Sequence, residues 1–236
     1  MVSINTVYQR VLAILNKENR GYLTPQEFNL MANQAQLEIF EQYFYDLNQF
    51  SRMGDNDSEY ANIIENVEEK IELFSNQIEL STYDDYYVDL PLNLYRIGTV
   101  SSGNIVFDKV SKKEKNNILN SPLLNIDSDN SYLDSNDNSP VGFYCILSKT
   151  LQIYPQIEQI TLDYISKPSG VSWAYINVDN VPLYDAANSI DFQLHDSDEP
   201  SLVIKILSYA GISIKAAEIT QVAETKDTKL TTEEKS

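Results

Sequence analysis

Apolar residues at the start of the chain recur at three- and four-residue spacing, which is the pattern of amphipathic helices. A first helix is predicted over residues 3–16. A second helix is predicted from Pro25 to about residue 50, because Thr24 supplies an N-cap, Pro25 fits the first helical position and Glu27 completes a capping box. A third helix is predicted to follow the turn-rich residues 54–58. The first and third helices would bury Ile4, Val7, Tyr8, Val11, Leu12 and Leu15, and Tyr60, Ile63, Ile64, Val67, Ile71 and Phe74.

The second predicted helix carries two adjacent apolar stripes. One stripe holds Phe28, Ala32, Ala35, Ile39 and Tyr43, and the other holds Leu37, Phe40, Phe44 and Leu47. A single core usually needs one stripe, so the second stripe must meet either another helix of the same chain or a neighbouring subunit. The sequence leaves both alternatives open.

After the third helix, the pattern changes to short apolar runs separated by turn residues, which indicates antiparallel strands. Two turns are predicted at residues 102–104 and 148–150, a short helix at residues 111–119 and a long exposed loop at residues 125–139. Alternation at Ile190, Phe192 and Leu194 predicts an edge strand. A last helix opens at residues 197–200, and Gly211 is expected to bend or break it. The other predicted strands are residues 86–90, 94–100, 105–110, 142–147, 151–154 and 159–165.

These elements predict an α+β fold with an N-terminal helical bundle, a central antiparallel β domain with long polar loops, and a C-terminal helix. The predicted division is residues 1–80 for the bundle, 81–195 for the β-rich domain, 196–225 for the C-terminal helix and 226–236 for a flexible charged tail.

The charge balance narrows the classes of function. The chain has 35 acidic and 17 basic residues and a formal net charge of -18, which repels phosphate backbones and argues against sequence-specific nucleic-acid binding. An acidic surface would still suit a conduit through which DNA slides. The single cysteine, Cys145, cannot form an intramolecular disulfide, and neither a signal peptide nor a membrane span is predicted. We therefore expect synthesis and assembly in a cytoplasm.

The sequence does not predict a calcium-binding loop. Asp127, Asp129 and Ser131 have the opening spacing of an EF-hand loop, but Tyr132 replaces the required glycine and Asn138 the bidentate glutamate. Asp55, Asp57 and Glu59 fail in the same way, with Tyr60 in the glycine position.

Nucleophilic catalysis and phosphate binding also lack support. His195 is the only histidine, and Cys145 lies in an apolar run that favours a buried, unreactive thiol. The seven glycines do not form a phosphate-binding loop, and no local context marks one pair of acids for glycoside hydrolysis. The sequence thus predicts a protein that is not an enzyme, with no catalytic, cofactor-binding or metal-binding residues.

Sixteen tyrosines could form a carbohydrate-binding or subunit interface, or could simply suit half-buried strands. The second explanation is favoured. The tyrosines considered are Tyr83, Tyr86, Tyr87, Tyr95, Tyr144, Tyr154, Tyr164, Tyr175 and Tyr184.

Three parts of the chain resemble the ring proteins of crAss-like phages. Residues 19–29 and 33–40 resemble their N-terminal helices. Residues 153–155 and 160–168, followed by Trp173, look like their strand pair and proline-tryptophan stretch, and residues 192–197 and 199–207 resemble their C-terminal region. The shared motifs are structural and nominate no catalytic residue.

The resemblance implies a virion protein of the head-to-tail connector, similar in role to the adaptor proteins of short-tailed phages. Its partners would be copies of itself in a ring of twelve, the portal protein and other tail or ring proteins, with genomic DNA passing through the lumen and no membrane contact. The alternatives are a glycan-binding or glycan-hydrolysing tail-associated protein, and an assembly chaperone absent from the mature particle.

Overall fold

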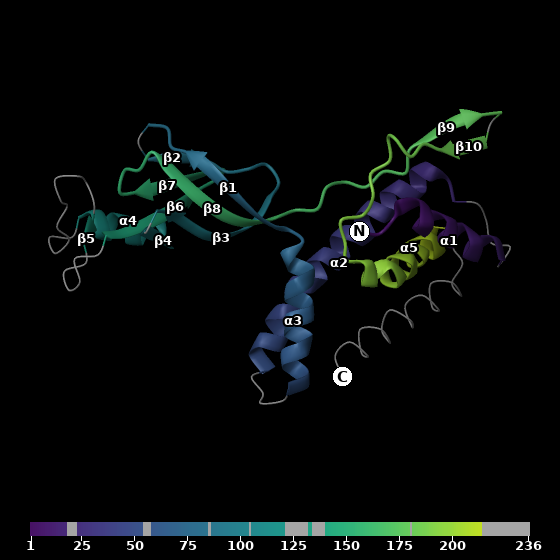
Figure 1. Ribbon diagram of the computed structural model, residues 1–236, viewed down its shortest axis with the longest axis horizontal. Helices are drawn as coiled ribbons and strands as arrows, with labels where there is room; N and C mark the ends of the chain where they lie inside the picture. Colours follow the sequence, from purple (N-terminus) through teal and green to yellow (C-terminus); the bar gives the residue numbers. More distant parts are fainter. Residues whose placement is uncertain are drawn as a thin grey trace. The chain divides into compact units, whose positions relative to one another are not determined.

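The computed structural model describes residues 1–17, 23–53, 58–84, 86–103, 105–120, 132–133, 140–179 and 181–213. These residues form a mixed α+β protein, as the sequence predicts. The chain divides into two compact units (Figure 1). The helical unit combines Met1–Leu73 with Pro168–Ser236, and the sheet unit is Phe74–Lys167.

This division differs from the predicted boundaries at residues 80, 195 and 225. The helical unit is built from both ends of the chain, because residues 168–195 pack on the helices rather than on the sheet. The predicted tail of residues 226–236, and the part of the predicted C-terminal helix beyond Ser213, lie outside the described residues.

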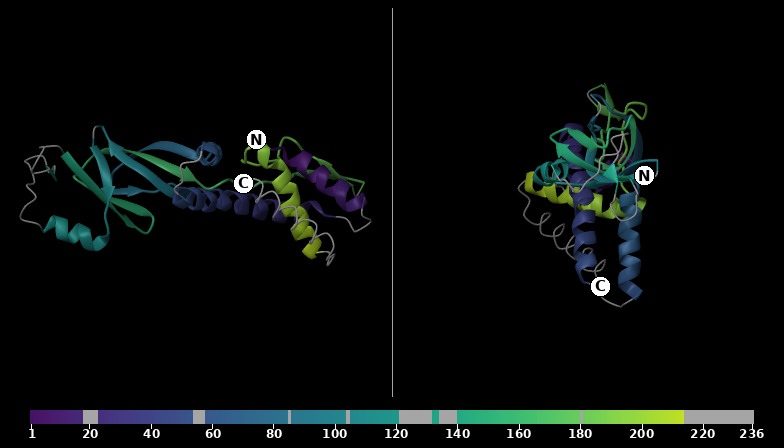
Figure 2. Two further views of the ribbon diagram at one scale, coloured as in Figure 1. Left: turned by 90° about the horizontal axis from the view of Figure 1, so that it is seen from below. Right: turned by 90° about the vertical axis from the view of Figure 1, so that its left-hand side faces the viewer.

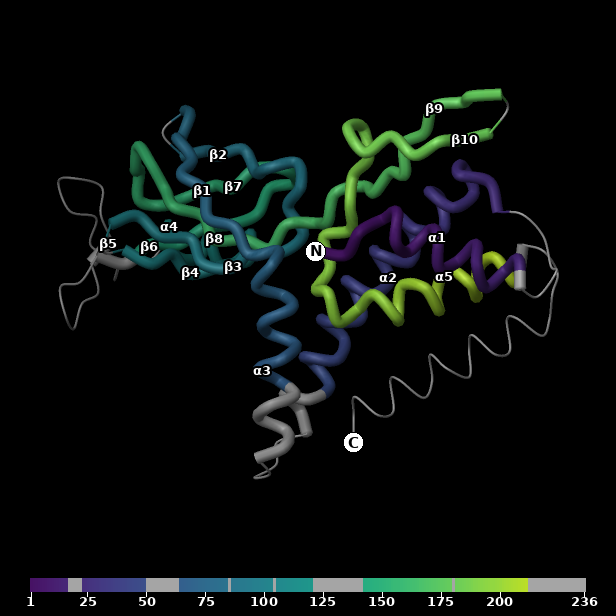
Figure 3. Tube along the Cα trace, turned by 45° about the vertical axis from the view of Figure 1, so that its right-hand side comes forward, coloured from purple at the N-terminus to yellow at the C-terminus, as the bar shows by residue number. Residues whose placement is uncertain are grey.

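The helical unit contains α1, α2, α3 and α5 (Figures 1 and 3). α5 packs against both α1 and α2, and α3 runs back beside the second half of α2 (Figure 2). The predicted capping box is confirmed, since the Glu27 carboxylate accepts from the Thr24 amide at 3.0 Å and the Glu27 amide donates to Thr24 Oγ1 at 3.3 Å. The bounds are Ile4–Lys17 for α1, Pro25–Met53 for α2, Ser58–Glu72 for α3, Asp196–Asp198 for the 3-10 helix η1 and Glu199–Ser213 for α5.

One prediction near the C-terminal end was wrong. Ile190, Phe192 and Leu194 do not form a strand: Ile190 makes an isolated bridge to Ser172, while Phe192 and Leu194 are fully buried in the helical unit. Phe192 and Leu194 thus alternate as buried side chains without a ladder of hydrogen bonds, whereas Ile190 is 48% exposed. Gly211 lies inside α5, which continues to Ser213, the last residue that the structure describes.

The sheet unit is an eight-stranded sheet with strand order β1-β8-β3-β4-β6-β7-β2, and β5 also pairs with β6. All pairs are antiparallel except β4 with β6, which are parallel. Parallel neighbours need a crossover, and α4 lies in the connection between these two strands. The strands are β1 Ser75–Ser81, β2 Tyr87–Asp89, β3 Leu94–Ser102, β4 Ile105–Lys109, β5 Tyr132–Leu133, β6 Pro140–Leu147, β7 Thr150–Tyr154 and β8 Gln159–Ser166, and α4 is Lys112–Leu119.

The predicted strands and the short helix are confirmed, with ends that differ by a few residues. Both predicted turns join paired strands, β3 with β4 and β6 with β7, and Gly103 and Ser148 have positive φ of 56° and 57°. β1 was missed, because only Ile78 and Leu80 are apolar in this largely exposed edge strand. Of the predicted loop at residues 125–139, only Tyr132 and Leu133 lie within the described residues.

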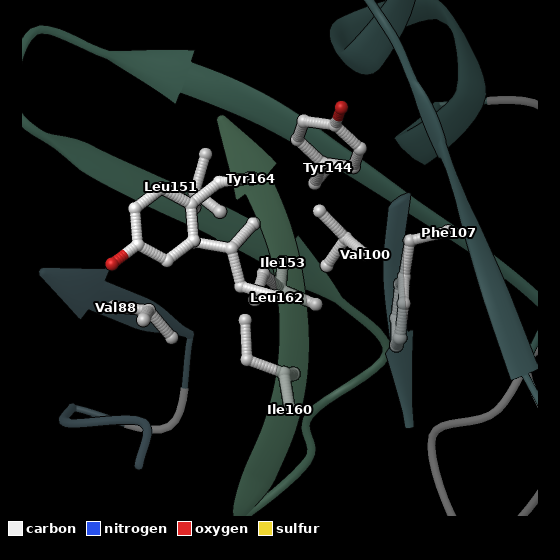
Figure 4. Close-up of a cluster of buried hydrophobic side chains, with 9 residues drawn as sticks. All are labelled: Val88, Val100, Phe107, Tyr144, Leu151, Ile153, Ile160, Leu162 and Tyr164. Atoms are coloured by element: carbon white, nitrogen blue, oxygen red, sulfur yellow. The ribbon is translucent and has the colours of Figure 1, made fainter. Parts of the chain in front are cut away.

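One face of the sheet forms a continuous apolar core (Figure 4). Alternate residues of neighbouring strands supply it, as a sheet with one buried face requires. The buried residues are Val88, Val100, Phe107, Tyr144, Leu151, Ile153, Ile160, Leu162 and Tyr164. Burial raises the pKa of the Tyr144 phenol, with Asp108 adding to the effect.

Candidate interaction surface

The residues considered for metal binding do not form a site in the described part of the chain. Among the described residues, no three His, Cys, Asp or Glu side chains are placed to hold a metal ion. Both acidic loops lie largely outside the described residues; of their positions, Glu59 and Tyr60 are in the first turn of α3 and Tyr132 is in β5.

Cys145 and His195 belong to different units and have separate roles. The Cys145 thiol is buried and lies 3.7 Å from Gln152 Oε1 in the sheet unit. His195 caps η1, where its ring nitrogen Nδ1 accepts from the Ser197 amide at 3.2 Å and lies 2.8 Å from Ser197 Oγ. His195 therefore has a local capping role at the start of η1.

A buried polar cluster joins α2, α3 and η1. Asp198 is 4% exposed; its Oδ2 accepts from the Tyr43 hydroxyl at 2.6 Å, and its Oδ1 lies 2.9 Å from Lys70 Nζ. Lys70 Nζ also lies 5.6 Å from the centroid of the Tyr43 ring. Both carboxylate oxygens are occupied by side chains of the fold, so the cluster fixes three elements rather than presenting a reactive acid.

A ladder of amide side chains fixes residues 169–173 on α2. Asn33 pairs with both backbone groups of Val171 at 2.8 and 2.9 Å, and Asn29 does the same with Trp173 at 3.2 and 2.8 Å. Four residues of helix rise about 6 Å, and two residues of extended chain span about 6.6 Å, so the two periods match. Sequence reasoning missed this ladder.

The second apolar stripe of α2 is largely covered within the chain. Phe40 and Phe44 are buried at 0% and 3% exposure, while Leu37 and Leu47 are half-buried. All five residues of the first stripe are buried. α2 packs against both α3 and α5. Of the two alternatives, contact with other helices of the same chain is therefore favoured for this stripe.

A β-hairpin missed from the sequence is anchored on Trp173. It consists of β9, Tyr175–Val178, and β10, Val181–Tyr184. The Trp173 ring stacks with Tyr175 and Tyr184, at centroid distances of 5.9 and 5.6 Å, and also lies 4.5 Å from the Tyr8 ring. Its indole Nε1 donates to Asn5 Oδ1 at 3.1 Å. One face of the hairpin is therefore fixed to the helical unit.

The opposite face of this hairpin is aliphatic and exposed. Ile176 pairs with Leu183 and Val178 pairs with Val181, so all four side chains lie on the face opposite Tyr175. Their exposed fractions are 59%, 51%, 46% and 57% respectively. We call these four residues the hairpin apolar face. The strands stand clear of α1 and α2 in Figures 1 and 3.

The sequence does contain a signal for this hairpin. Ile176 and Val178, then Val181 and Leu183, alternate with other residues around Asp179 and the position after it, which is a hairpin pattern. Pro182 weakens that pattern, because proline inside a strand is confined to edges. Both strands of a two-stranded sheet are edges, so here the proline is tolerated.

The tyrosines of the sheet unit form a smaller aromatic group. Tyr83 stacks with Tyr87 at a centroid distance of 5.9 Å, and its hydroxyl donates to Asp89 at 3.2 Å. Desolvation, then the neighbouring Asp89 carboxylate, raises the pKa of the Tyr83 phenol. Tyr87 and Tyr154 both accept from the Gln152 amide, at 3.4 and 2.7 Å. Most of these hydroxyls serve the fold, which fits the structural interpretation of strand tyrosines.

No protein-family model matches this sequence, and no curated protein is similar enough to count as a relative. Within the described residues, no helix combines the length and hydrophobicity needed to cross a lipid bilayer.

Proposed function

We propose that this chain is a structural virion protein, one subunit of an oligomeric ring in the portal-tail connector of a phage. Its partners are copies of itself, the portal protein and other tail or ring proteins, and genomic DNA passes through the ring lumen without sequence-specific binding. In this role it acts by packing rather than by catalysis. Its place is the neck of the particle, which is assembled in the bacterial cytoplasm.

The observation that carries the proposal is an exposed aliphatic surface, the hairpin apolar face, in a chain whose described buried polar cluster is part of the fold. Contiguous exposed apolar patches of a few hundred Å² are often binding sites in soluble proteins. The hairpin apolar face is such a patch, whereas the Asp198 cluster is enclosed by Tyr43 and Lys70. A protein that associates is favoured by this arrangement over one that turns over a substrate.

The segments that resemble crAss-like phage ring proteins support the same role. They include the capping box of α2, strand β8, Trp173 and the start of α5. Of these, Trp173 and α5 lie in the helical unit and contact its N-terminal helices, whereas β8 lies in the sheet unit. The residues that carry the resemblance have structural roles, so the resemblance concerns the architecture of the protein.

The formal net charge of -18 supports passage of DNA without adhesion, because an acidic wall repels phosphates. The acidic residues would have to line the lumen for this to operate. A basic or neutral channel wall would remove this part of the proposal.

Mass spectrometry of purified infectious particles, combined with electron microscopy of their neck, tests the proposal. We expect the chain in stoichiometric amounts and a ring density at the neck. Its absence from finished particles would contradict the proposal and favour an assembly chaperone. Turnover of host surface glycans by the purified protein would favour the glycan-hydrolysing alternative instead.

A further inference from the structure

The hairpin is held in place by Trp173, but its apolar face is exposed. An isolated two-stranded hairpin is marginal in water unless one of its faces packs on another element. Here Tyr175 and Tyr184 pack on Trp173, and the four aliphatic side chains on the other face remain 46–59% exposed. The anchor explains how the hairpin persists, and leaves the aliphatic face available to an occupant.

The outer edge of β10 is poorly suited to hydrogen bonding with an added strand. Pro182 pairs with Asn177 but has no amide hydrogen, so the ladder bonds must be made by the neighbouring pairs. The nitrogen of Pro182 then faces away from β9, where an added strand would need a donor. Docking through the aliphatic side chains is therefore favoured over strand addition at this edge.

The distribution of charge favours a second copy of this chain as the molecule that covers the hairpin apolar face. Between Tyr175 and Tyr184, Asp179 is the only charged residue, although the whole chain carries a formal charge of -18. A foreign protein adapted to bind so acidic a chain would gain from basic groups paired with carboxylates. Two copies of the acidic chain repel each other unless they meet where charge is scarce. The hairpin apolar face is such a place.

Its size makes the hairpin apolar face one part of a larger interface. Four aliphatic side chains that are about half exposed present on the order of 300 Å² of apolar surface. A stable two-protein interface buries roughly 800 Å² per partner, so this face would be only part of a larger contact. In a closed ring, the hairpin apolar face of each copy contacts one neighbour, and the hairpin apolar face of the other neighbour contacts that copy. Every copy then has two interfaces.

We infer that the hairpin apolar face docks on the adjacent copy of this chain. The inference rests on the proposed ring and names the surface through which neighbouring subunits join. It assigns Ile176, Val178, Val181 and Leu183 to a head-to-tail interface that closes with the ring.

The test compares two double variants of the full chain with the unaltered protein, by native mass spectrometry and light scattering over a range of concentrations. I176D/L183D places two charges on the hairpin apolar face. L92D/V106D adds the same two charges at exposed aliphatic positions elsewhere, where Leu92 is 97% and Val106 61% exposed. We expect I176D/L183D to weaken assembly about tenfold or more, and L92D/V106D to assemble like the unaltered chain.

Trp173 provides the folding control, because it is the only tryptophan and lies against the anchored face of the hairpin. Its emission spectrum should be the same in the unaltered chain and in I176D/L183D. If I176D/L183D shifts the spectrum, the milder variant Leu183→Ser replaces it in the same comparison. Assembly that is equally strong in every variant would overturn the docking surface and leave the ring itself standing.

A cross-linking measurement identifies the occupant. V178C carries a photoreactive label in a mixture of ordinary and ¹⁵N-labelled copies, and Cys145 is the only other cysteine and is buried. We expect cross-linked peptides that join the two isotopes. Cross-links confined to single copies, or an unaltered chain that stays monomeric at every concentration, would overturn the inference. Particle mass spectrometry then decides separately whether the chain is a connector protein.

Discussion

Replacing Tyr43 with phenylalanine tests whether the buried Asp198 cluster holds the helical unit together. The Tyr43 hydroxyl donates to Asp198 Oδ2 at 2.6 Å, and Tyr43 is only 5% exposed. Phenylalanine keeps the ring, its packing and the nearby Lys70 ammonium, and removes the hydroxyl alone. The substitution therefore isolates one hydrogen bond to a buried carboxylate.

The expected loss follows from the kind of bond. A hydrogen bond to a charged group is worth about 1.5–3 kcal/mol, and here its removal leaves a carboxylate oxygen buried. Lys70 Nζ remains 2.9 Å from the other oxygen, so the carboxylate stays paired and the cost should lie near the middle of that range. A loss of about 2 kcal/mol corresponds to roughly a 30-fold shift in the folding equilibrium.

Urea unfolding followed by Trp173 fluorescence is the suitable assay, because Trp173 and Tyr43 belong to the same unit. With an m-value of about 2 kcal/mol per molar urea, the midpoint of Tyr43→Phe should fall by about 1 M. Tyr45→Phe is the matched control on the same helix, since Tyr45 is 65% exposed and its change should stay within about 0.5 kcal/mol. Equal midpoints for the two variants would refute the reasoning.

Three further predictions concern the helix cap, the sheet and the assembly. Hydrogen bonds from Thr24 lower the pKa of Glu27 below its ordinary value of 4.5, so its contribution is present above pH 4.5 and is lost as the pH falls through the lowered pKa. Glu27→Gln should therefore be less stable to urea than the unaltered chain at neutral pH, and this difference should shrink in acid. Gly142→Ala should destabilise the sheet unit by about 1–3 kcal/mol, because the added Cβ would lie 2.5 Å from the Phe107 ring; faster thiol labelling of Cys145 would report it. Sedimentation should show assembly strengthened, not weakened, between about 0.05 M and about 0.5 M salt, because salt screens repulsion between acidic copies.

The sequence predicted those parts of the fold that local patterns determine. The start of α2 is set by the side chains of Thr24 and Glu27 acting on nearby backbone groups, so its signal lies within four residues. The strands around Leu151 and Leu162 alternate in and out of one core, and a period of two is visible without knowing the partner strand. These are properties of short windows.

The parts that were missed depend on partners distant in the chain. Asn29 and Asn33 resemble ordinary polar residues of an exposed helix face, and only the fold brings residues 169–173 against them. The Asp198 cluster likewise draws on Tyr43 and Lys70, which are 155 and 128 positions away in sequence. No local pattern marks such a pair, since many acids and many bases are equally available along the chain.

The location of surplus apolar surface changes between the sequence and the structure, and this bears on how subunits would meet. From the pattern alone, the second stripe of α2 had to meet either another helix of the same chain or a neighbouring subunit. Phe40 and Phe44 are instead buried by other helices of the same chain, so covering that stripe does not require a second copy. The hairpin apolar face, on β9 and β10, is exposed instead, and the other face of this hairpin is held by Trp173. A subunit built this way can complete its helical core before it meets a neighbour. In the proposed ring, its association would then depend on a small uncharged face rather than on helix exchange. Assembly of such subunits would therefore be expected to follow folding, with substitutions at the hairpin altering the ring and substitutions along α2 altering the stability of each subunit.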